Sequence, residues 1–133
     1  MSIEETNKSI IRRSFERTLT QEEVYAPNFI DHNLGPRFQD RNCLECYKEA
    51  DKEFGAAFSN IHHTIHDLIA EGDKVVVYGT TTATHTGTYY GKPPTGKQVS
   101  FSVITIYRLV DGKIVESWDD IGLHTELEQL LAL

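Results

Sequence analysis

Three carboxyl groups lie beside the single tryptophan, near the C-terminal end of the chain. If this segment is a strand, Glu116, Trp118 and Asp120 share one face and Asp119 points away. A carboxyl in apolar surroundings keeps its proton to higher pH, so it can take a proton from carbon and return one to a carbonyl oxygen. Asp120, beside Trp118 on that face, is therefore a candidate acid/base group. The alternative is that Asp120 caps the strand end or a C-terminal helix.

His85 is a second candidate, at the end of a threonine-rich stretch just before Gly87. Imidazole titrates near neutral pH, so His85 could donate to or accept from a substrate oxygen. Alternatively, it is hydrogen-bonded at a strand end and fixes the loop that begins at Gly87. A role in the site is the prediction that we follow here.

The remaining histidine cluster could bind a metal ion. On a strand, His62 and His66 share a face, and two imidazoles in reach can hold zinc. No third ligand is evident on that face, because Asp67 shares the face of His63. We therefore expect a solvated strand edge here and no metal.

The two cysteines and one glycine-rich loop resemble known motifs only in part. The segment Cys43-Leu44-Glu45-Cys46 has redox spacing, but no βαβ pattern precedes it and it opens a helix that should pack. Two cysteines are too few for a disulfide scaffold. Residues 91–97 have the wrong order for a phosphate-binding loop, and two prolines remove backbone donors. We expect a structured loop over a cavity mouth, and no cofactor.

The elements that must position these residues follow from hydrophobic spacing and turn residues. Helical spacing predicts helices first, and strands rich in Val, Ile, Thr and Tyr follow. This order predicts an α+β fold in which helices cover one face of an antiparallel sheet and a pocket lies between them. The expected helices are 4–19, 21–25, 44–58 and 125–131, with a loop at 33–42, and the expected strands are 60–70, 75–85, 99–110 and 113–120.

Size and charge limit the possible functions. The chain has 133 residues, which predicts one domain over 1–133. Its formal net charge of −7 argues against nucleic acid or an anionic membrane as partner. No apolar run is long enough to span a membrane. The acidic N-terminal segment does not have the pattern of a signal peptide, so we expect a cytoplasmic protein.

From about Tyr25 onward, the sequence resembles the SnoaL-like polyketide cyclases of the nuclear transport factor 2-like superfamily. The order and spacing of several short motifs agree together, although each motif alone is weak. These motifs are Ile69 to Val75, Thr84-His85-Thr86-Gly87, Gly91 to Lys97, Arg108, Asp111-Gly112-Lys113-Ile114 and Glu116-Ser117-Trp118.

This resemblance implies a cone-shaped barrel made of a curved, mainly antiparallel sheet wrapped around N-terminal helices. It also implies an apolar cavity, a homodimer, and aldol ring closure of a polyketide-derived ester without a cofactor. The family's acid/base aspartate lies four positions after the tryptophan, where this chain has Gly122. Asp120 has the same strand parity as that position, so it is the expected substitute. Beside Asp120, His85 and His32 would orient substrate oxygens, and a small hydrophobic molecule would contact His32, Trp118, Tyr107 and Phe54.

Two other functions fit the same residues. Because Gly122 replaces the usual aspartate, the domain could bind a hydrophobic ligand without catalysis. It could also be another lyase, isomerase or hydrolase, because one fold supports many reactions. Cyclase-like acid/base chemistry on a small carbonyl compound is the function that the sequence favours.

Overall fold

The structure is a computed structural model that describes residues 2–34, 38, 43–119 and 123–132, with side chains omitted for 123–126. Four helices and five strands occur in these residues, and the strands form one open sheet in the order β1-β5-β4-β3-β2. The elements are α1 (Ile3–Phe15), α2 (Gln21–Val24), β1 (Tyr25–Asp31), α3 (Leu44–Ala57), β2 (Phe58–Glu71), β3 (Lys74–His85), β4 (Gln98–Val110), β5 (Lys113–Trp118) and α4 (Leu123–Ala132).

The first two helices begin at side-chain caps. The Ser2 hydroxyl accepts the Glu5 N–H at the start of α1. Thr20 and Glu23 form the capping box that their spacing predicts at α2. The predicted first helix was too long, because Arg17 has a positive φ of 59° and α1 has already ended at Phe15.

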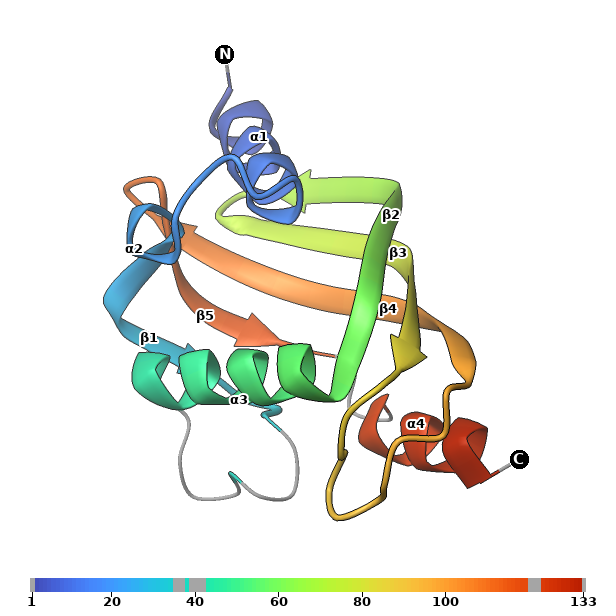
Figure 1. Ribbon diagram of the computed structural model, residues 1–133. Helices are drawn as coiled ribbons and strands as arrows, with labels where there is room; N and C mark the ends of the chain where they lie inside the picture. Colours follow the sequence, from blue (N-terminus) through green and yellow to red (C-terminus); the bar gives the residue numbers. More distant parts are fainter. Residues whose placement is uncertain (1, 35–37, 39–42, 120–122, 133) are drawn as a thin grey trace.

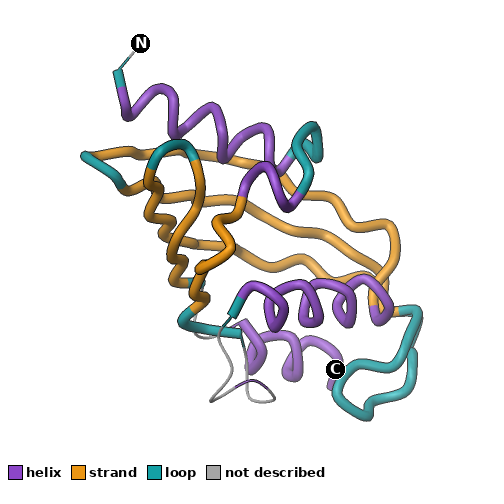
Figure 2. Tube along the Cα trace, turned by 90° about the vertical axis from the view of Figure 1, so that its left-hand side faces the viewer, coloured by secondary structure: helices purple, strands orange, loops and turns teal. Residues whose placement is uncertain are grey.

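Strands β3 and β4 form the middle of the sheet, and they alternate strictly between a buried and a more exposed face. Their register pairs Val75 with Tyr107 and Val77 with Thr105, so these four residues share the buried face. Helices α1 and α3 pack on the sheet, as Figures 1 and 2 show from two directions. We call the face beneath the helices the inner face and the opposite face the outer face.

Strand β1 was missed in the sequence, where residues 28–32 lacked a clear pattern. It pairs in parallel with β5, and Asp31 lies opposite Ser117. The fold class is confirmed as α+β with a curved, mainly antiparallel sheet, which is open and contains one parallel pair, β1 with β5. As a result, the end of β1 and the end of β5 lie side by side.

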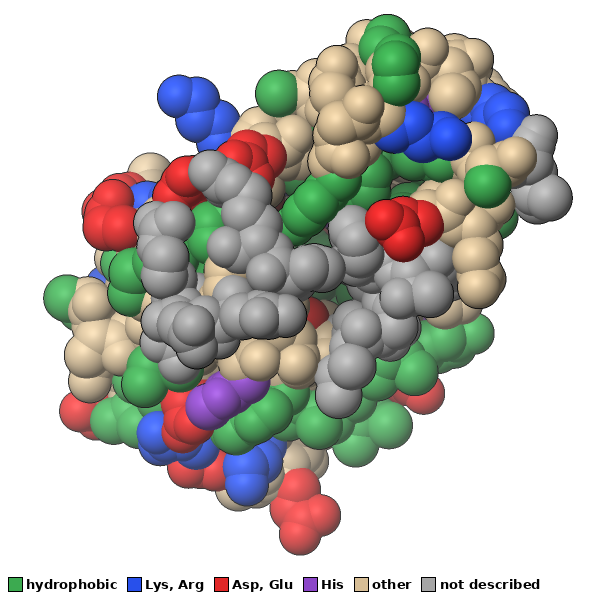
Figure 3. All heavy atoms as spheres, turned by 90° about the horizontal axis from the view of Figure 1, so that it is seen from below, with side chains coloured by type: hydrophobic (Ala, Val, Ile, Leu, Met, Phe, Trp, Pro, Cys, Tyr) green, Lys and Arg blue, Asp and Glu red, His purple; other side chains and the backbone are tan. Residues whose placement is uncertain are grey.

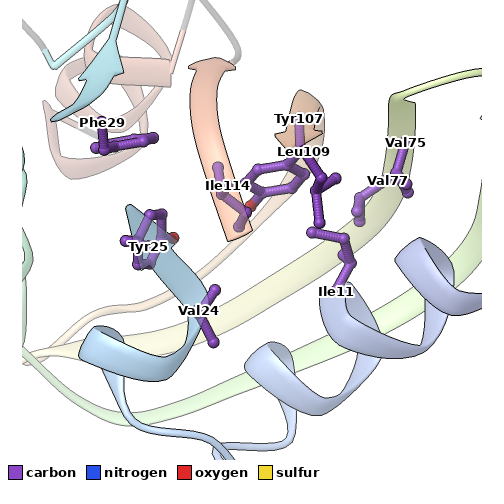
Figure 4. Close-up of a cluster of buried hydrophobic side chains, with 9 residues drawn as sticks. All are labelled: Ile11, Val24, Tyr25, Phe29, Val75, Val77, Tyr107, Leu109 and Ile114. Atoms are coloured by element: carbon purple, nitrogen blue, oxygen red, sulfur yellow. The ribbon is translucent and has the colours of Figure 1, made fainter. Parts of the chain in front are cut away.

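Two apolar clusters fill the inner side of the sheet. The first combines residues from α1, α2, β1, β3, β4 and β5, and Figure 4 shows it. The second lies toward α4 and includes Phe58, Phe101 and Leu127. Within the described residues, each helix is too short or too polar to cross a bilayer.

The outer face carries apolar side chains that none of the described helices covers. Ile104 in β4 is 49% exposed and Tyr78 in β3 is 45% exposed, and the two are register partners. Ile69 of β2 and Ile106 of β4 both pair with Val76, so the exposed patch continues across three strands. We call Ile69, Tyr78, Ile104 and Ile106 the outer patch.

Candidate active site

The side chain of Asp119 follows the inner face of β5. The pairing of β5 with β4 is irregular, since Ile114 lies opposite Leu109 while Glu116 lies opposite Arg108. This irregularity changes the alternation, so Ile114 and Ser117 are the buried residues of the strand. Asp119 continues the face opposite Trp118, as its parity predicts, and that face is the inner one.

Asp31, at the end of β1, is the partner of Asp119. It is 1% exposed, and its Oδ1 accepts the backbone N–H of Asn33 at 2.9 Å. The Asn33 side chain in turn donates to the Asp119 carbonyl oxygen at 3.0 Å, which ties the two strand ends together. Among the described residues, no neutral donor reaches Asp31 Oδ2. A protonated Asp119 carboxyl could supply that donor, because a side-chain hydrogen bond with Asp31 is among the causes that raise the pKa of Asp119.

The surroundings of Asp119 favour its protonated form. Burial raises the pKa of Asp119 well above its ordinary value, and the hydrogen bond to Asp31 and the charge of Asp31 raise it further. A hydrogen bond from the Thr105 hydroxyl lowers this pKa by less than burial raises it. The combined effect is a carboxyl that keeps its proton well above the usual aspartate range.

Three tyrosines surround this pair with hydroxyl groups. Tyr25 of β1 donates to the hydroxyl of Tyr47 in α3 at 3.1 Å, and their ring centroids are 4.8 Å apart. Tyr107 approaches from β4 and lies in the first cluster with Tyr25 (Figure 4). Burial raises the pKa of all three phenols, and the charge of Asp119 contributes to each increase. All three stay neutral at physiological pH, and their hydroxyls can donate to a bound oxygen.

The predicted catalytic residue Asp120, and Gly122 at the family's aspartate position, lie outside the described residues. The role of Asp120 therefore stays a prediction. Figure 3 views the molecule from the side that carries α3 and α4, where hydrophobic side chains are exposed between polar and charged ones.

His85 lies deep in the protein at the end of β3 and is fully buried. Its Nδ1 accepts the backbone N–H of Thr95 at 3.1 Å, so the neutral ring carries its hydrogen on Nε2. That Nε2 has no hydrogen-bond partner in the described residues and belongs to a ring 5.3 Å from that of Phe58. His85 thus anchors the loop at Thr95 and also holds one buried donor without an acceptor.

The four predicted contact residues separate into different places. His32 and Trp118 stack with centroids 4.9 Å apart. Trp118 pairs with Ile106 of the outer face, away from Asp119. Phe54 packs against the second cluster. Of the four, Tyr107 is the residue that lies near the carboxyl pair, and the predicted roles of the other three stay predictions.

The histidines of β2 bind neighbouring polar groups. His62 Nε2 is 3.1 Å from the Asn60 side-chain oxygen, and His66 Nε2 is 2.7 Å from the Thr80 hydroxyl. No group of three His, Cys, Asp or Glu side chains suited to a metal ion occurs among the described residues. A cleft of about 430 Å³ lies nearby between α1 and β2, lined in part by Lys8, Arg12 and Asp67. The carboxyl pair is not part of it.

The two cysteines are joined. Helix α3 begins at Leu44, as predicted, and Cys43 is its N-cap. The sequence argued against a disulfide, on the number of cysteines and the expected compartment. In the structure, Cys43 and Cys46 form one disulfide, because a helix start brings residues three positions apart into reach.

Sequence reasoning missed Asp31, Tyr47 and Thr105. The signal for Asp31 was its parity with Phe29, because both are buried on alternate positions of β1. A carboxyl that continues the apolar face of a strand is a candidate site residue. That inference requires residues 25–31 to be recognised as a strand, which their mixed composition did not allow.

Comparisons with known proteins agree with this architecture. The model of the SnoaL-like polyketide cyclase family matches residues 15–130. A solved structure from Bacillus cereus, assigned to the polyketide cyclases, is 30% identical, with a TM-score of 0.73 over 96% of this chain and 81% of that one. One from a Jannaschia species, assigned as SnoaL-like, is 22% identical, with a TM-score of 0.84 over 96% and 92%.

TsrD from Streptomyces laurentii has the same fold, with 22% identity and a TM-score of 0.78 over the whole of both chains. No curated protein sequence matches this chain. The family model spans most of the chain, including strands β1 and β5, at whose ends Asp31 and Asp119 lie. The chain belongs to the SnoaL-like polyketide cyclase family.

Proposed function

We propose that this protein catalyses aldol-type ring closure of a small hydrophobic carbonyl compound, with Asp119 as the acid/base group. The observation that carries the proposal is the position of Asp119 beside the buried carboxyl of Asp31, at two strand ends tied together through Asn33, where burial and Asp31 raise the pKa of Asp119. Acid/base catalysis at neutral pH needs a group whose pKa lies near the working pH. An isolated, hydrated aspartate would lose its proton far below that pH.

The carboxyl pair can support both proton transfers of the ring closure. The carboxyl without the proton takes one from the carbon next to a substrate carbonyl, and the resulting carbanion attacks a second carbonyl carbon. The protonated carboxyl gives its proton to the oxygen of that second carbonyl. A carbon–carbon bond forms, one proton is taken up and one is released, so the pair ends with one proton as it began.

The surroundings support an apolar substrate and two points of orientation. Residues of the first cluster, including Phe29 and Ile114, pack near the tyrosines. The neutral hydroxyls of Tyr107 and Tyr47, both within electrostatic reach of Asp119, are the donors that we propose for substrate oxygens. His85 lies at the far end of β3, opposite Lys97, and its predicted role in the site stays a prediction. A neutral donor aimed at an oxygen that gains charge stabilises the transition state.

Turnover of a model polyketide methyl ester tests this proposal. We expect Asp119→Asn to lose about 10²–10⁴-fold in rate, as is usual when a general acid/base group is removed. Glu116→Gln is the matched control, since it removes a carboxyl from the same strand on the outer face. Asp120→Asn shows which of the two neighbouring aspartates is the acid/base group. Full activity in Asp119→Asn with a large loss in Asp120→Asn would transfer the role to Asp120.

A binding domain without catalysis is the second candidate, and Gly122 at the family's aspartate position favours it. In that case the wild type binds the ester without turnover, and Gly122→Asp gains activity because it restores the missing carboxyl. Turnover by the wild type that depends on Asp119 would exclude this alternative.

A further inference from the structure

We propose that the Cys43–Cys46 disulfide is a reversible redox site and that its state is transmitted to Tyr47 in the candidate active site. The disulfide lies at the start of α3, and Tyr47 is the next residue after Cys46. Neither the family nor the acid/base chemistry requires this pair.

The two sulfurs differ in access. Cys43 is exposed, whereas Cys46 is 4% exposed. Cys43 is therefore the residue of the pair that an external thiolate can approach, and Cys46 is shielded. Thiol–disulfide exchange depends on such access and on how well the leaving sulfur carries charge.

The start of α3 also stabilises a thiolate at Cys43. Its Sγ accepts the backbone N–H of Cys46 at 3.3 Å, and it lies at the positive end of a 14-residue helix. Glu45 in the first turn opposes this effect, although Lys48 lies 3.6 Å from its carboxylate. The cap and the helix dipole both act on Cys43, the accessible sulfur.

Reduction by a dithiol balances as follows. One thiolate of the reductant attacks Cys43 Sγ, the sulfur–sulfur bond breaks, and its electron pair goes to Cys46 Sγ, which takes a proton. The second thiol of the reductant then attacks the mixed disulfide and releases Cys43. Two electrons and two protons pass to the protein, and the reductant leaves as its own disulfide.

Two backbone contacts connect this pair to the site. Cys43 forms an antiparallel bridge with Ile30, the residue before Asp31. The backbone N–H of Tyr47 donates to the Cys43 carbonyl oxygen at 3.0 Å, and the Tyr47 hydroxyl contacts Tyr25. Opening the disulfide frees the first turn of α3, so it changes how firmly the Tyr47 ring is held.

Alkylation across mixtures of oxidised and reduced dithiothreitol tests the redox site without using turnover. Alkylated in denaturant after equilibration, the full chain should take up two alkyl groups at the reducing end and none at the oxidising end, reversibly. Cys46→Ala should form a mixed disulfide with oxidised glutathione through Cys43, and Cys43→Ser should not, because Cys46 is buried. Serine also caps helices well, so Cys43→Ser retains α3. Alkylation of both cysteines in every mixture, or preferential reaction of Cys46, would overturn the proposal.

Near-ultraviolet circular dichroism tests the transmission to Tyr47. Reduction should change the tyrosine signal of the wild type, and most of that change should be lost in Tyr47→Phe. Cys43→Ser should show the same spectrum in both buffers. An identical difference spectrum in the wild type and Tyr47→Phe would show that the disulfide does not act on Tyr47.

Discussion

Asp119 and Glu116 are three positions apart, yet the two faces of the sheet shift their pKa values in opposite directions. On the inner side, burial and Asp31 raise the pKa of Asp119. On the outer side, hydrogen bonds from His32 and Arg108 lower the pKa of Glu116. The guanidinium of Arg108 is 2.6 Å from Glu116 Oε1. Carboxyl chemistry is thus set by the face to which a residue points, and the irregular β4–β5 pairing determines that face.

The two faces also differ in how their apolar residues are covered. Helices cover the inner clusters, whereas the outer patch is exposed, with Ile69 at 58%. Exposed apolar patches that span several strands usually mark interfaces. We propose that a second copy of this chain covers the outer patch, which is the homodimer that the family resemblance implies.

The largest expected effect is the loss of dimer affinity in Ile104→Glu. A charge placed in the outer patch of both copies would cost several kcal/mol at a self-complementary interface. We expect the dissociation constant to rise by about a hundredfold or more. Sedimentation or light scattering at micromolar concentration measures this. Thr88→Glu, in an exposed loop, is the charge control. A wild type that is monomeric would contradict the prediction.

The pH dependence of stability should be the next largest effect. The folded protein keeps the Asp119 proton while the unfolded chain loses it near the ordinary aspartate pKa, so stability falls as pH rises above that value. The fall continues up to the raised folded pKa, with a slope of at most about 1.4 kcal/mol per pH unit for one proton. Asp119→Asn should flatten this part of the curve. Thermal melts from pH 4 to 9 measure this pH dependence. Parallel curves for the wild type and Asp119→Asn would contradict the raised pKa of Asp119.

The smallest effect should come from Glu116→Gln. Its ion pairs with His32 and Arg108 are partly exposed, and exposed pairs contribute about 0–1 kcal/mol. The pKa of Glu116 is lowered, so its contribution is present above the ordinary glutamate pKa and is lost as pH falls through the lowered value. Urea unfolding at pH 7 and at pH 3 compares the two conditions. If Glu116→Gln lowered the free energy of unfolding as much as the loss of a buried ion-pair partner does, Glu116 would not be in the solvated environment that we assign to the outer face.

Much of the fold could be predicted, because its signals are local. The alternation along β3 and β4, the capping box at Thr20 and the start of α3 all follow from neighbouring residues. The site could not be predicted equally well, because it depends on pairing between distant segments. The irregular pairing of β5 with β4 places Asp119, and not Trp118, on the same face as the buried Ile114. The sequence Glu116-Ser117-Trp118 contains no signal for this irregularity.

The pairing of β1 with β5 has a consequence for the order of folding. Asn33 and Asp119 are 86 residues apart, and the contact between them closes a loop that contains most of the chain. Local hairpins such as β3–β4 close far shorter loops, so they should form earlier. An intermediate that holds only those hairpins would carry Asp31 and Asp119 as separate, hydrated carboxylates. Proton uptake from solvent should therefore accompany the last step of folding, when the two strand ends meet.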